Sequence, residues 1–176
     1  MAVRPVFIFP LVPEKFFNLG NSVMKQVHWV VDSFHDFTPD QLYNILQLRV
    51  DVFVVEQCCP YPELDDSDRH PETRHLAGHD QSGALIAYAR LLPPGLRFPE
   101  PNIGRFVVKK DSRGQGVGHQ LLREAVKEIN KIWPGHPIKI SAQDYLQRFY
   151  ERYGFIRMSD VYLEDEIPHI EMLRKV

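Results

Sequence analysis

The stretch that decides the fold of this chain is Ile103-Gly104-Arg105-Phe106-Val107-Val108-Lys109-Lys110-Asp111-Ser112-Arg113-Gly114-Gln115-Gly116-Val117-Gly118-His119-Gln120-Leu121-Leu122. Its pattern predicts an apolar strand, a charged glycine-rich turn and the start of an amphipathic helix. Glycines alternate at 114, 116 and 118, so no Cβ shields the backbone N–H groups of the turn.

These N–H groups favour an anion site. The first turn of a helix leaves N–H donors without intrahelical partners, and the helix dipole favours negative charge there. Arg113, at the mouth of the turn, would add a charge-assisted contact to a phosphate. The alternative is a tight strand-to-helix turn that needs glycine only for its geometry, and the glycines alone do not decide between the two.

Composition excludes several classes of protein. The chain has 176 residues and a net charge of −2, without the basic excess that nucleic-acid binding requires. It has no basic run and no apolar stretch of about 18 residues, so we expect no membrane contact. Residues 3–12 are apolar but contain Pro5 and Pro10, and we do not interpret them as a signal peptide. We expect residues 1–26 to be an N-terminal extension and 27–176 to form one domain.

The cysteine pattern favours a reducing compartment. Cys58 and Cys59 are neighbours, and a disulfide between them would be strained and would staple nothing. No Cys/His spacing is typical of a zinc site, so we expect two reduced thiols, no metal and a cytoplasmic protein.

Periodicity and turn residues predict the order of the elements. A strand over 26–34 precedes a helix over 39–54, for which Thr38, Pro39 and Gln41 form a capping box and first turn. An acidic, proline-containing loop follows at 56–71. The remaining predicted elements are strands 73–79, 84–92 and 102–109, a helix ending at Pro134-Gly135, strand 137–142, helix 144–153, and strands 155–161 and 168–174. Asp144 is a possible N-cap of the last helix and Gly154 its C-cap.

This order predicts an α/β (α+β) fold. Hairpins make the sheet mixed and mostly antiparallel, and a strand–helix–strand crossover adds one parallel pair. We expect about three to four helices to flank the sheet.

Two motifs in this order carry a family resemblance. Arg113-Gly114-Gln115-Gly116-Val117-Gly118 resembles the Arg/Gln-x-x-Gly-x-Gly/Ala signature of the GNAT superfamily of acyl-CoA-dependent N-acyltransferases, and lies between strand and helix as that signature requires. Phe149-Tyr150-Glu151-Arg152-Tyr153-Gly154-Phe155 resembles the end of the last helix of that family. More narrowly, segments 48–57, 59–61, 65–68 and 103–105 resemble the ElaA group of predicted acetyltransferases and the neighbouring acyl-homoserine-lactone synthases.

The resemblance implies a fold, an activity and a co-substrate. It implies the GNAT fold and an N-acetyltransferase that moves the acetyl group of acetyl-CoA to an amine by direct attack. Residues 113–118, namely Arg113, Gly114, Gln115, Gly116, Val117 and Gly118, would hold the pyrophosphate, and Phe106, Val107 and Val108 the pantetheine arm. Gln143 stands where the family often has the Asn that meets pantetheine, so the same amide is offered on a longer side chain.

Catalytic residues follow by the same resemblance. Tyr150 matches the acid that protonates the thiolate leaving group; its alternative is a core aromatic beside Phe149 and Tyr153. Glu56 and His75 are candidate bases, with Asp65 and Asp68 as others, although a strand histidine is more often structural. A base acting through water needs no dedicated residue.

The substrate site is predicted from a shared Arg/Asp pattern. The residues that match it are Arg49, Phe53, Asp65, Asp68, Arg90 and Arg105. The acids would bind a cationic substrate, or cap turns and pair with the arginines, because a charge on an apolar face needs a partner. We expect a small-molecule or peptide amine as acceptor and a monomer or homodimer. The alternatives are a lactone-synthase-like acyltransferase and a non-catalytic acyl-CoA-binding regulator.

Overall fold

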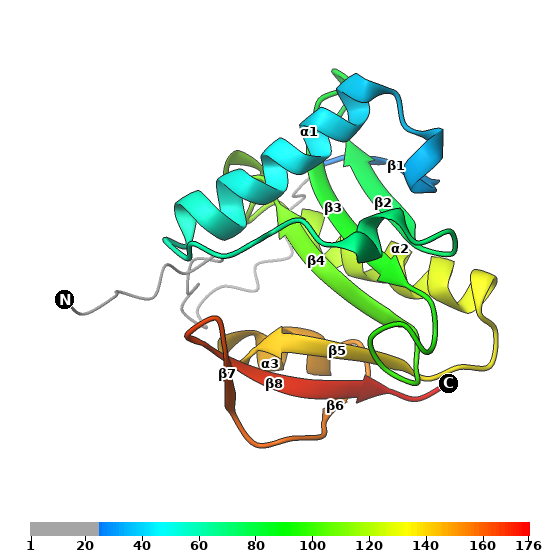
Figure 1. Ribbon diagram of the computed structural model, residues 1–176, viewed down its shortest axis with the longest axis vertical. Coiled ribbons are helices and arrows are strands. Elements are labelled where there is room, and N and C mark those ends of the chain that lie inside the picture. Colours follow the sequence, from blue (N-terminus) through cyan, green and yellow to red (C-terminus); the bar gives the residue numbers. More distant parts are fainter. Residues whose placement is uncertain (1–24) are drawn as a thin grey trace, which may run out of the picture.

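The computed structural model describes residues 25–176, and its core is one mixed eight-stranded sheet (Figure 1). The strands are β1 (His28–Asp32), β2 (Arg74–His79), β3 (Leu85–Leu92), β4 (Asn102–Val108), β5 (Ile138–Gln143), β6 (Phe155–Arg157), β7 (Tyr162–Glu164) and β8 (Ile167–Arg174). Their order is β1-β2-β3-β4-β5-β8-β6, with β7 paired to β8. The sheet is antiparallel except for β4–β5, which confirms the predicted fold class. The expected extension over 1–26 lies outside the described residues except for Lys25 and Gln26.

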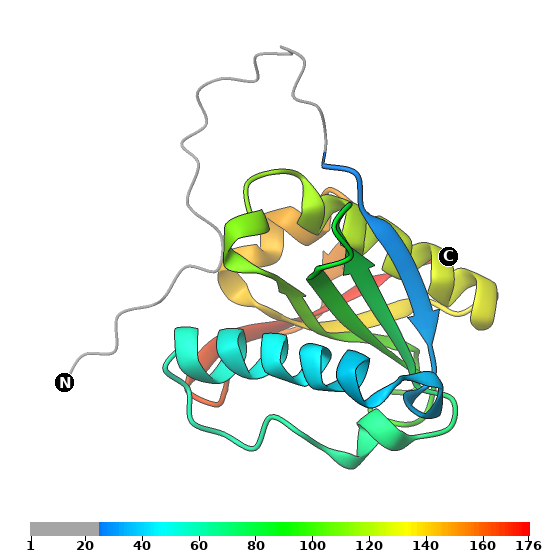
Figure 2. The same ribbon diagram turned by 90° about the horizontal axis from the view of Figure 1, so that it is seen from above.

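Helices cover both faces of the sheet, as Figure 2 shows from above. They are α1 (Pro39–Arg49), α2 (Val117–Ile132) and α3 (Gln147–Glu151). Because successive strand residues face opposite sides, Ala87 and Ala89 of β3 pack in the α2 core while Tyr88 packs against Ile45 of α1. Central strands buried on both faces explain why β3 reads as a continuous apolar run.

The first helix begins as predicted but continues differently. Thr38 and Gln41 form the expected capping box, with Thr38 N–H donating to Gln41 Oε1 at 2.9 Å. The α-helix ends at Arg49, not at residue 54, and continues as a π-helix over Val50–Glu56. Its wide turns carry i→i+5 bonds such as Gln57 N–H to the Val52 carbonyl, at 3.1 Å. The sequence period did not distinguish the two, and several valines in this segment disfavour the tighter α-helical turn.

The C-terminal elements differ from those predicted. The predicted strand 155–161 is shorter, since β6 ends at Arg157, and β7 was not predicted; both strands pair with β8. The predicted helix 144–153 is a 3-10 turn at Asp144–Leu146 followed by α3, so Asp144 is not its N-cap. The loop after Glu56 also holds a 3-10 helix, Asp66–Arg69. In each case the end of the element is set by a turn of a few residues, which is too short to show a hydrophobic period in the sequence.

Strands β4 and β5 separate along their length. They pair at Asn102↔Lys139 alone, and beyond that point their carboxyl ends diverge (Figure 1). On its other edge β4 pairs with β3, where Ala89 faces two β4 residues. This bulge places Arg105 at φ +50°, a left-handed conformation that a non-glycine residue adopts only under constraint. The divergence leaves a wedge between the two halves of the sheet.

Candidate active site

A cavity of about 400 Å³ lies where β4 and β5 separate. We call it the β4–β5 cavity. Its lining includes Phe53, Gln57, Tyr61, Arg105, Phe106, Ser141, Gln143, Tyr150, Glu164 and His169. The predicted site residues Phe53, Arg105, Phe106, Gln143 and Tyr150 are therefore brought together, although they come from four segments of the chain.

The glycine-rich turn presents unpaired amides. Gly114 and Gly116 have φ of +73° and +78°, and Gly116 is the left-handed N-cap of α2. Gln120 is the first residue of this helix whose amide bonds back, to the Gly116 carbonyl at 3.1 Å. Within residues 25–176, the amides from Gly114 to Gly118 donate to no backbone acceptor. The turn is thus an array of N–H donors at a helix N-terminus, which suits an anion.

Arg113 holds this turn and is itself neutralised. Its Nε donates to the Val108 carbonyl at 2.8 Å, and its two terminal nitrogens reach Glu56 at 2.5 and 2.9 Å. The pair joins the end of the π-helix to the glycine turn. Arg113 and Glu56 therefore balance each other, and the N–H groups remain as the anion donors.

The wedge side of β4 offers backbone groups. Lys109 N–H donates to the Ile86 carbonyl of β3 at 2.8 Å. Because alternate residues of a strand direct their backbone groups to opposite edges, those of Phe106 and Val108 point into the wedge, while Val107 pairs with Tyr88. The Val108 carbonyl already accepts from Arg113, so Phe106 and the Val108 N–H are the groups left open there. An extended amide-bearing ligand fits such an edge as an added strand.

Tyr150 is buried at the cavity with its ring held in an aromatic cluster. Phe149, Phe155 and Phe106 lie with ring centroids 5.0, 5.8 and 6.1 Å from it. No hydrogen bond joins its hydroxyl to another residue of the described segment, and burial, with Tyr145 nearby, raises the pKa of that hydroxyl. The ring is part of the core, while the residue lines the site, so the two interpretations made from the sequence are compatible.

The predicted substrate arginines and aspartates form an ion-pair network. Arg49 Nε contacts Glu63 at 2.6 Å and its Nη1 contacts Asp68 at 2.8 Å. Arg90 contacts Asp65 and Asp68, each at 2.8 Å. The third arginine, Arg105, contacts Glu63 at 2.7 Å and Asp65 at 3.4 Å. Three arginines thus face three acids, and the loop after the π-helix is fastened to α1, β3 and β4.

Two arginines of this network are buried, so their charges require partners. Arg49 is 0% exposed and Arg90 1%. Burial alone would raise the pKa of Asp65, but hydrogen bonds and charge from Arg90, with charge from Arg105, lower it to about 2. Burial likewise opposes the charge of Asp68, and Arg49 and Arg90 outweigh it and lower its pKa. Of this set only Arg105 lines the β4–β5 cavity.

His75 lies under the network, away from the β4–β5 cavity. Its ring is 1% exposed, with Nδ1 at 2.7 Å from the Tyr88 hydroxyl and Nε2 at 3.0 Å from the Asp68 carbonyl. Burial lowers its pKa to about 4, and Arg49 and Arg90 act in the same direction, against the Asp68 contacts. With both ring nitrogens occupied, the geometry favours the structural interpretation of His75.

Several cavity residues carried no recognisable signal in the sequence. Gln57 Nε2 is a buried donor without a partner in the described segment, although its Oε1 accepts from Gln143 at 3.3 Å. His169 and Glu164 belong to the β7–β8 hairpin, whose strands were only partly predicted. Lone polar residues on short strands show no spacing that links them to the cavity.

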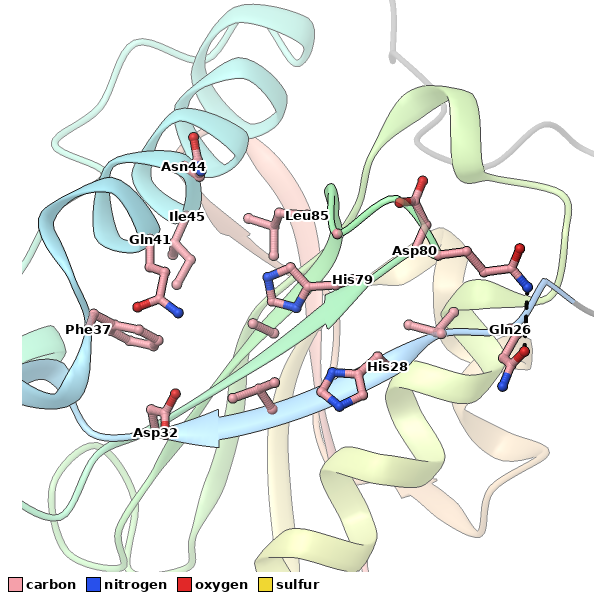
Figure 3. Close-up of a pocket in the computed structure, with 15 residues that line it drawn as sticks. Gln26, His28, Asp32, Phe37, Gln41, Asn44, Ile45, His79, Asp80 and Leu85 are labelled. Carbon is pink, nitrogen blue, oxygen red and sulfur yellow. Dashed lines mark hydrogen bonds between the residues drawn. The ribbon is translucent and has the colours of Figure 1, made fainter.

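A larger cavity, of about 710 Å³, lies between α1 and the strands β1 and β2 (Figure 3). His28 and His79, partners across these strands, both face it, and burial together with the charge of His28 lowers the pKa of His79. It is lined neither by β4 nor by Tyr150, both of which line the β4–β5 cavity, so we place the candidate active site in the β4–β5 cavity.

Residues 25–176 contain neither a membrane-spanning helix nor a cluster of metal ligands. No helix there combines the length and apolar character needed to span a bilayer. No three His, Cys, Asp or Glu side chains in the same part of the chain are grouped as metal ligands would be.

Comparison with known proteins defines the class. The model of the "Acetyltransferase (GNAT) domain" matches residues 36–176, and the chain belongs to this family of acyltransferases. It is 41% identical to Protein ElaA of Escherichia coli over 150 residues, 85% of this chain and 97% of ElaA. A UPF0039 protein of Mycobacterium tuberculosis is 43% identical over 140 residues, 79% of this chain and 87% of that protein.

A solved structure agrees with the fold. The crystal structure of an acyl-CoA N-acyltransferase from Pseudomonas aeruginosa is 46% identical, with a TM-score of 0.80, and the match covers 85% of this chain and 99% of that one. The chain is therefore an ElaA-like GNAT protein, as its motifs predicted.

Proposed function

We propose that the protein is an N-acetyltransferase that transfers the acetyl group of acetyl-CoA to an amine. The observation that carries the proposal is the presence of three features in one fold: the amides of residues 114–118 that donate to no backbone acceptor within residues 25–176, the β4 edge at Phe106 beside β5, and Tyr150 at the β4–β5 cavity. Membership of an acyltransferase family makes a CoA thioester the donor to test first.

The residues present fit the donor in three places. The amides after Gly114 would bind the pyrophosphate, with the exposed Lys109 and Lys110 adding positive charge beside them. Phe106 and Val108 would pair with the amides of the pantetheine arm. The side-chain amides of Gln143 and Gln57 would reach that arm from the opposite side of the wedge, where Gln57 Nε2 is an unpaired buried donor.

The acceptor side of the cavity supports an amine. Its lining includes the acids Glu164 and Asp165, and Cys59 Sγ contacts the Asp165 carbonyl at 3.4 Å, which joins the long loop to the β7–β8 turn. Acids at the entrance attract a protonated amine. The Arg/Asp pattern shared with lactone synthases is used here for internal ion pairs, so we do not propose lactone formation.

Tyr150 would act as the acid. Attack of the amine nitrogen on the thioester carbonyl forms a C–N bond, and the C–S bond then breaks. The Tyr150 hydroxyl, which burial keeps protonated at neutral pH, would donate its proton to the departing sulfur.

The first prediction concerns Tyr150→Phe. Removing the hydroxyl while keeping the ring should lower kcat by about 10² to 10⁴-fold, because proton donation to sulfur is lost. The measurement is thiol release from acetyl-CoA with benzylamine, 1,4-diaminobutane, lysine and a tripeptide amide as acceptors. Binding of acetyl-CoA, followed by calorimetry, should stay within a few-fold.

Tyr43→Phe is the matched control, since Tyr43 is exposed on α1 and outside the cavity. Full turnover by Tyr150→Phe would remove Tyr150 from the mechanism. Tight acetyl-CoA binding by the wild type without turnover of any amine tested would instead indicate a non-catalytic acyl-CoA-binding protein.

A further inference from the structure

The acceptor side of the β4–β5 cavity contains a polar cluster on β5, β7 and β8. Ser141 Oγ lies 2.6 Å from the Tyr162 hydroxyl and donates to Glu164 Oε2 at 2.7 Å. Glu164 Oε1 accepts from Arg97 at 2.7 Å. His169 stacks on Tyr162, with ring centroids 6.3 Å apart and an interplanar angle of 30°. The cluster therefore holds the His169 ring in a fixed orientation.

The hydrogen bond of His169 determines its tautomer. Nδ1 lies 2.8 Å from the Ile167 carbonyl. A carbonyl oxygen only accepts, so Nδ1 must carry the proton and Nε2 of the neutral ring keeps a lone pair. Within residues 25–176, no hydrogen bond occupies Nε2. His169 thus presents a proton acceptor from the wall of the cavity.

The candidate bases named from the sequence are all occupied, Asp65 by Arg90 and Arg105. Both oxygens of Glu56 accept from Arg113. The two ring nitrogens of His75 are bonded, and it does not line the cavity. Asp68 is held by two arginines outside the cavity. Glu164 lines the cavity, but Arg97 and Ser141 bind its oxygens.

We propose that His169 is the catalytic base that removes the proton from the acceptor amine. This assignment rests on the proposed function. Nε2 accepts one proton from the ammonium group, directly or through one water, and the neutral nitrogen then forms the C–N bond as the C–S bond breaks. Tyr150 donates its proton to sulfur, and the second proton lost by nitrogen restores Tyr150 through water. The imidazolium releases its proton to solvent, so amide, free thiol and one proton are the products.

Several groups face His169 and act on its charge. Tyr162 and Glu164 approach from β7, Glu171 lies two residues along β8 and is paired with Lys139, and Arg97 is bound to Glu164. Burial acts to raise the pKa of Glu164, but hydrogen bonds from Ser141 and Arg97 and the charges of Arg97 and His169 outweigh it and lower that pKa. Ser141 and Gln143 on β5 are neutral, so Glu164 is the acid that contacts this cluster directly.

The test is His169→Asn with acetyl-CoA and the fastest amine of the panel above. The Asn side-chain N–H₂ can still donate to the Ile167 carbonyl, but no basic nitrogen remains. We expect kcat to fall by about 10²-fold or more. As the pH is raised, the wild-type kcat/KM should level off once the imidazole is neutral. The kcat/KM of the variant should instead keep rising with the fraction of the acceptor present as free amine. Added imidazole should restore part of the rate.

His136→Asn, at an exposed histidine between α2 and β5, is the matched control. An unchanged kcat in His169→Asn, or a loss that neither alkaline pH nor imidazole restores, would overturn the base role while leaving the acetyltransferase intact. Absence of turnover by the wild type with every amine would overturn the proposed function itself, and the base role with it.

Discussion

At the scale of single residues, His75 shows how the environment sets the role of a titratable group. A strand histidine beside an acidic loop is a reasonable candidate base from the sequence. In the fold it is buried between Tyr88 and the Asp68 carbonyl, and two arginines lie nearby. It serves as a neutral connector between the sheet and the loop.

The buried neutral state of His75 predicts a pH dependence of stability. Its pKa is about 4 in the folded protein and near 6.5 in the unfolded chain. Between these values the unfolded state binds more protons, so the free energy of unfolding should fall as the pH falls from about 6.5 to 4. The total loss is on the order of 3 kcal/mol. Urea unfolding at a series of pH values measures it.

His75→Gln is the diagnostic variant for this effect, since an amide keeps hydrogen bonding but does not titrate. Its stability should be lower at pH 7, yet vary less than that of the wild type between pH 6.5 and 4. His136→Gln should follow the wild type. An identical pH slope in His75→Gln would assign the dependence to other groups.

At the scale of elements, the glycine turn works through its backbone conformation. A Cβ built on Gly114 meets no atom within 4 Å, so space is not what selects glycine there. Its φ of +73° is the reason, because a side chain in the left-handed region costs about 1 to 2 kcal/mol. Relief of that strain would turn the following amides away from a common anion.

Gly114→Ala should therefore raise the Kd for acetyl-CoA by about tenfold, the change expected for 1.4 kcal/mol. Gly135→Ala is a matched control, since Gly135 has φ +79°, equally open surroundings, and a place outside the turn. Both variants should lose similar stability, and calorimetry should show weaker binding in Gly114→Ala alone. Equal affinity in the two would mean that the amides of this turn do not bind the donor.

At the scale of the whole molecule, the network of three arginines and three acids joins distant segments. Asp68, from the loop, lies between Arg49 of α1 and Arg90 of β3, at 2.8 Å from each. In a buried network the removal of one partner leaves an uncompensated charge, which costs more than the pair contributes.

Asp68→Asn should thus destabilise the protein by about 3 to 5 kcal/mol, because two buried arginines lose a shared carboxylate. Chemical denaturation measures the change. Glu124→Gln, which breaks the exposed Glu124–Lys127 pair on α2, should stay within about 1 kcal/mol. A loss in Asp68→Asn as small as in this control would show that solvent screens the network.

Much of the fold was predictable because long amphipathic segments and glycine turns are local signals. The sheet class, the parallel pair, α2 and the capping box at Thr38 were all correctly predicted. The π-helix and β7 were missed because each depends on a few hydrogen bonds rather than on a hydrophobic period. At the site, motifs indicated Tyr150 and residues 113–118. Glu63 and His169 were not predicted, since only tertiary packing brings them beside Arg49 and Tyr162.

The π-helix at Val50–Glu56 has a consequence for how the chain tolerates changes of length. Each residue of an α-helix turns the chain by about 100°. Deleting one residue between 50 and 56 would let α1 continue as a regular helix, a local gain. The same deletion would rotate the end of the helix, separate Glu56 from Arg113 and misplace the start of the long loop. The irregular turns thus act as a spacer of fixed length, whose exposed positions accept substitution more readily than the segment accepts a one-residue deletion.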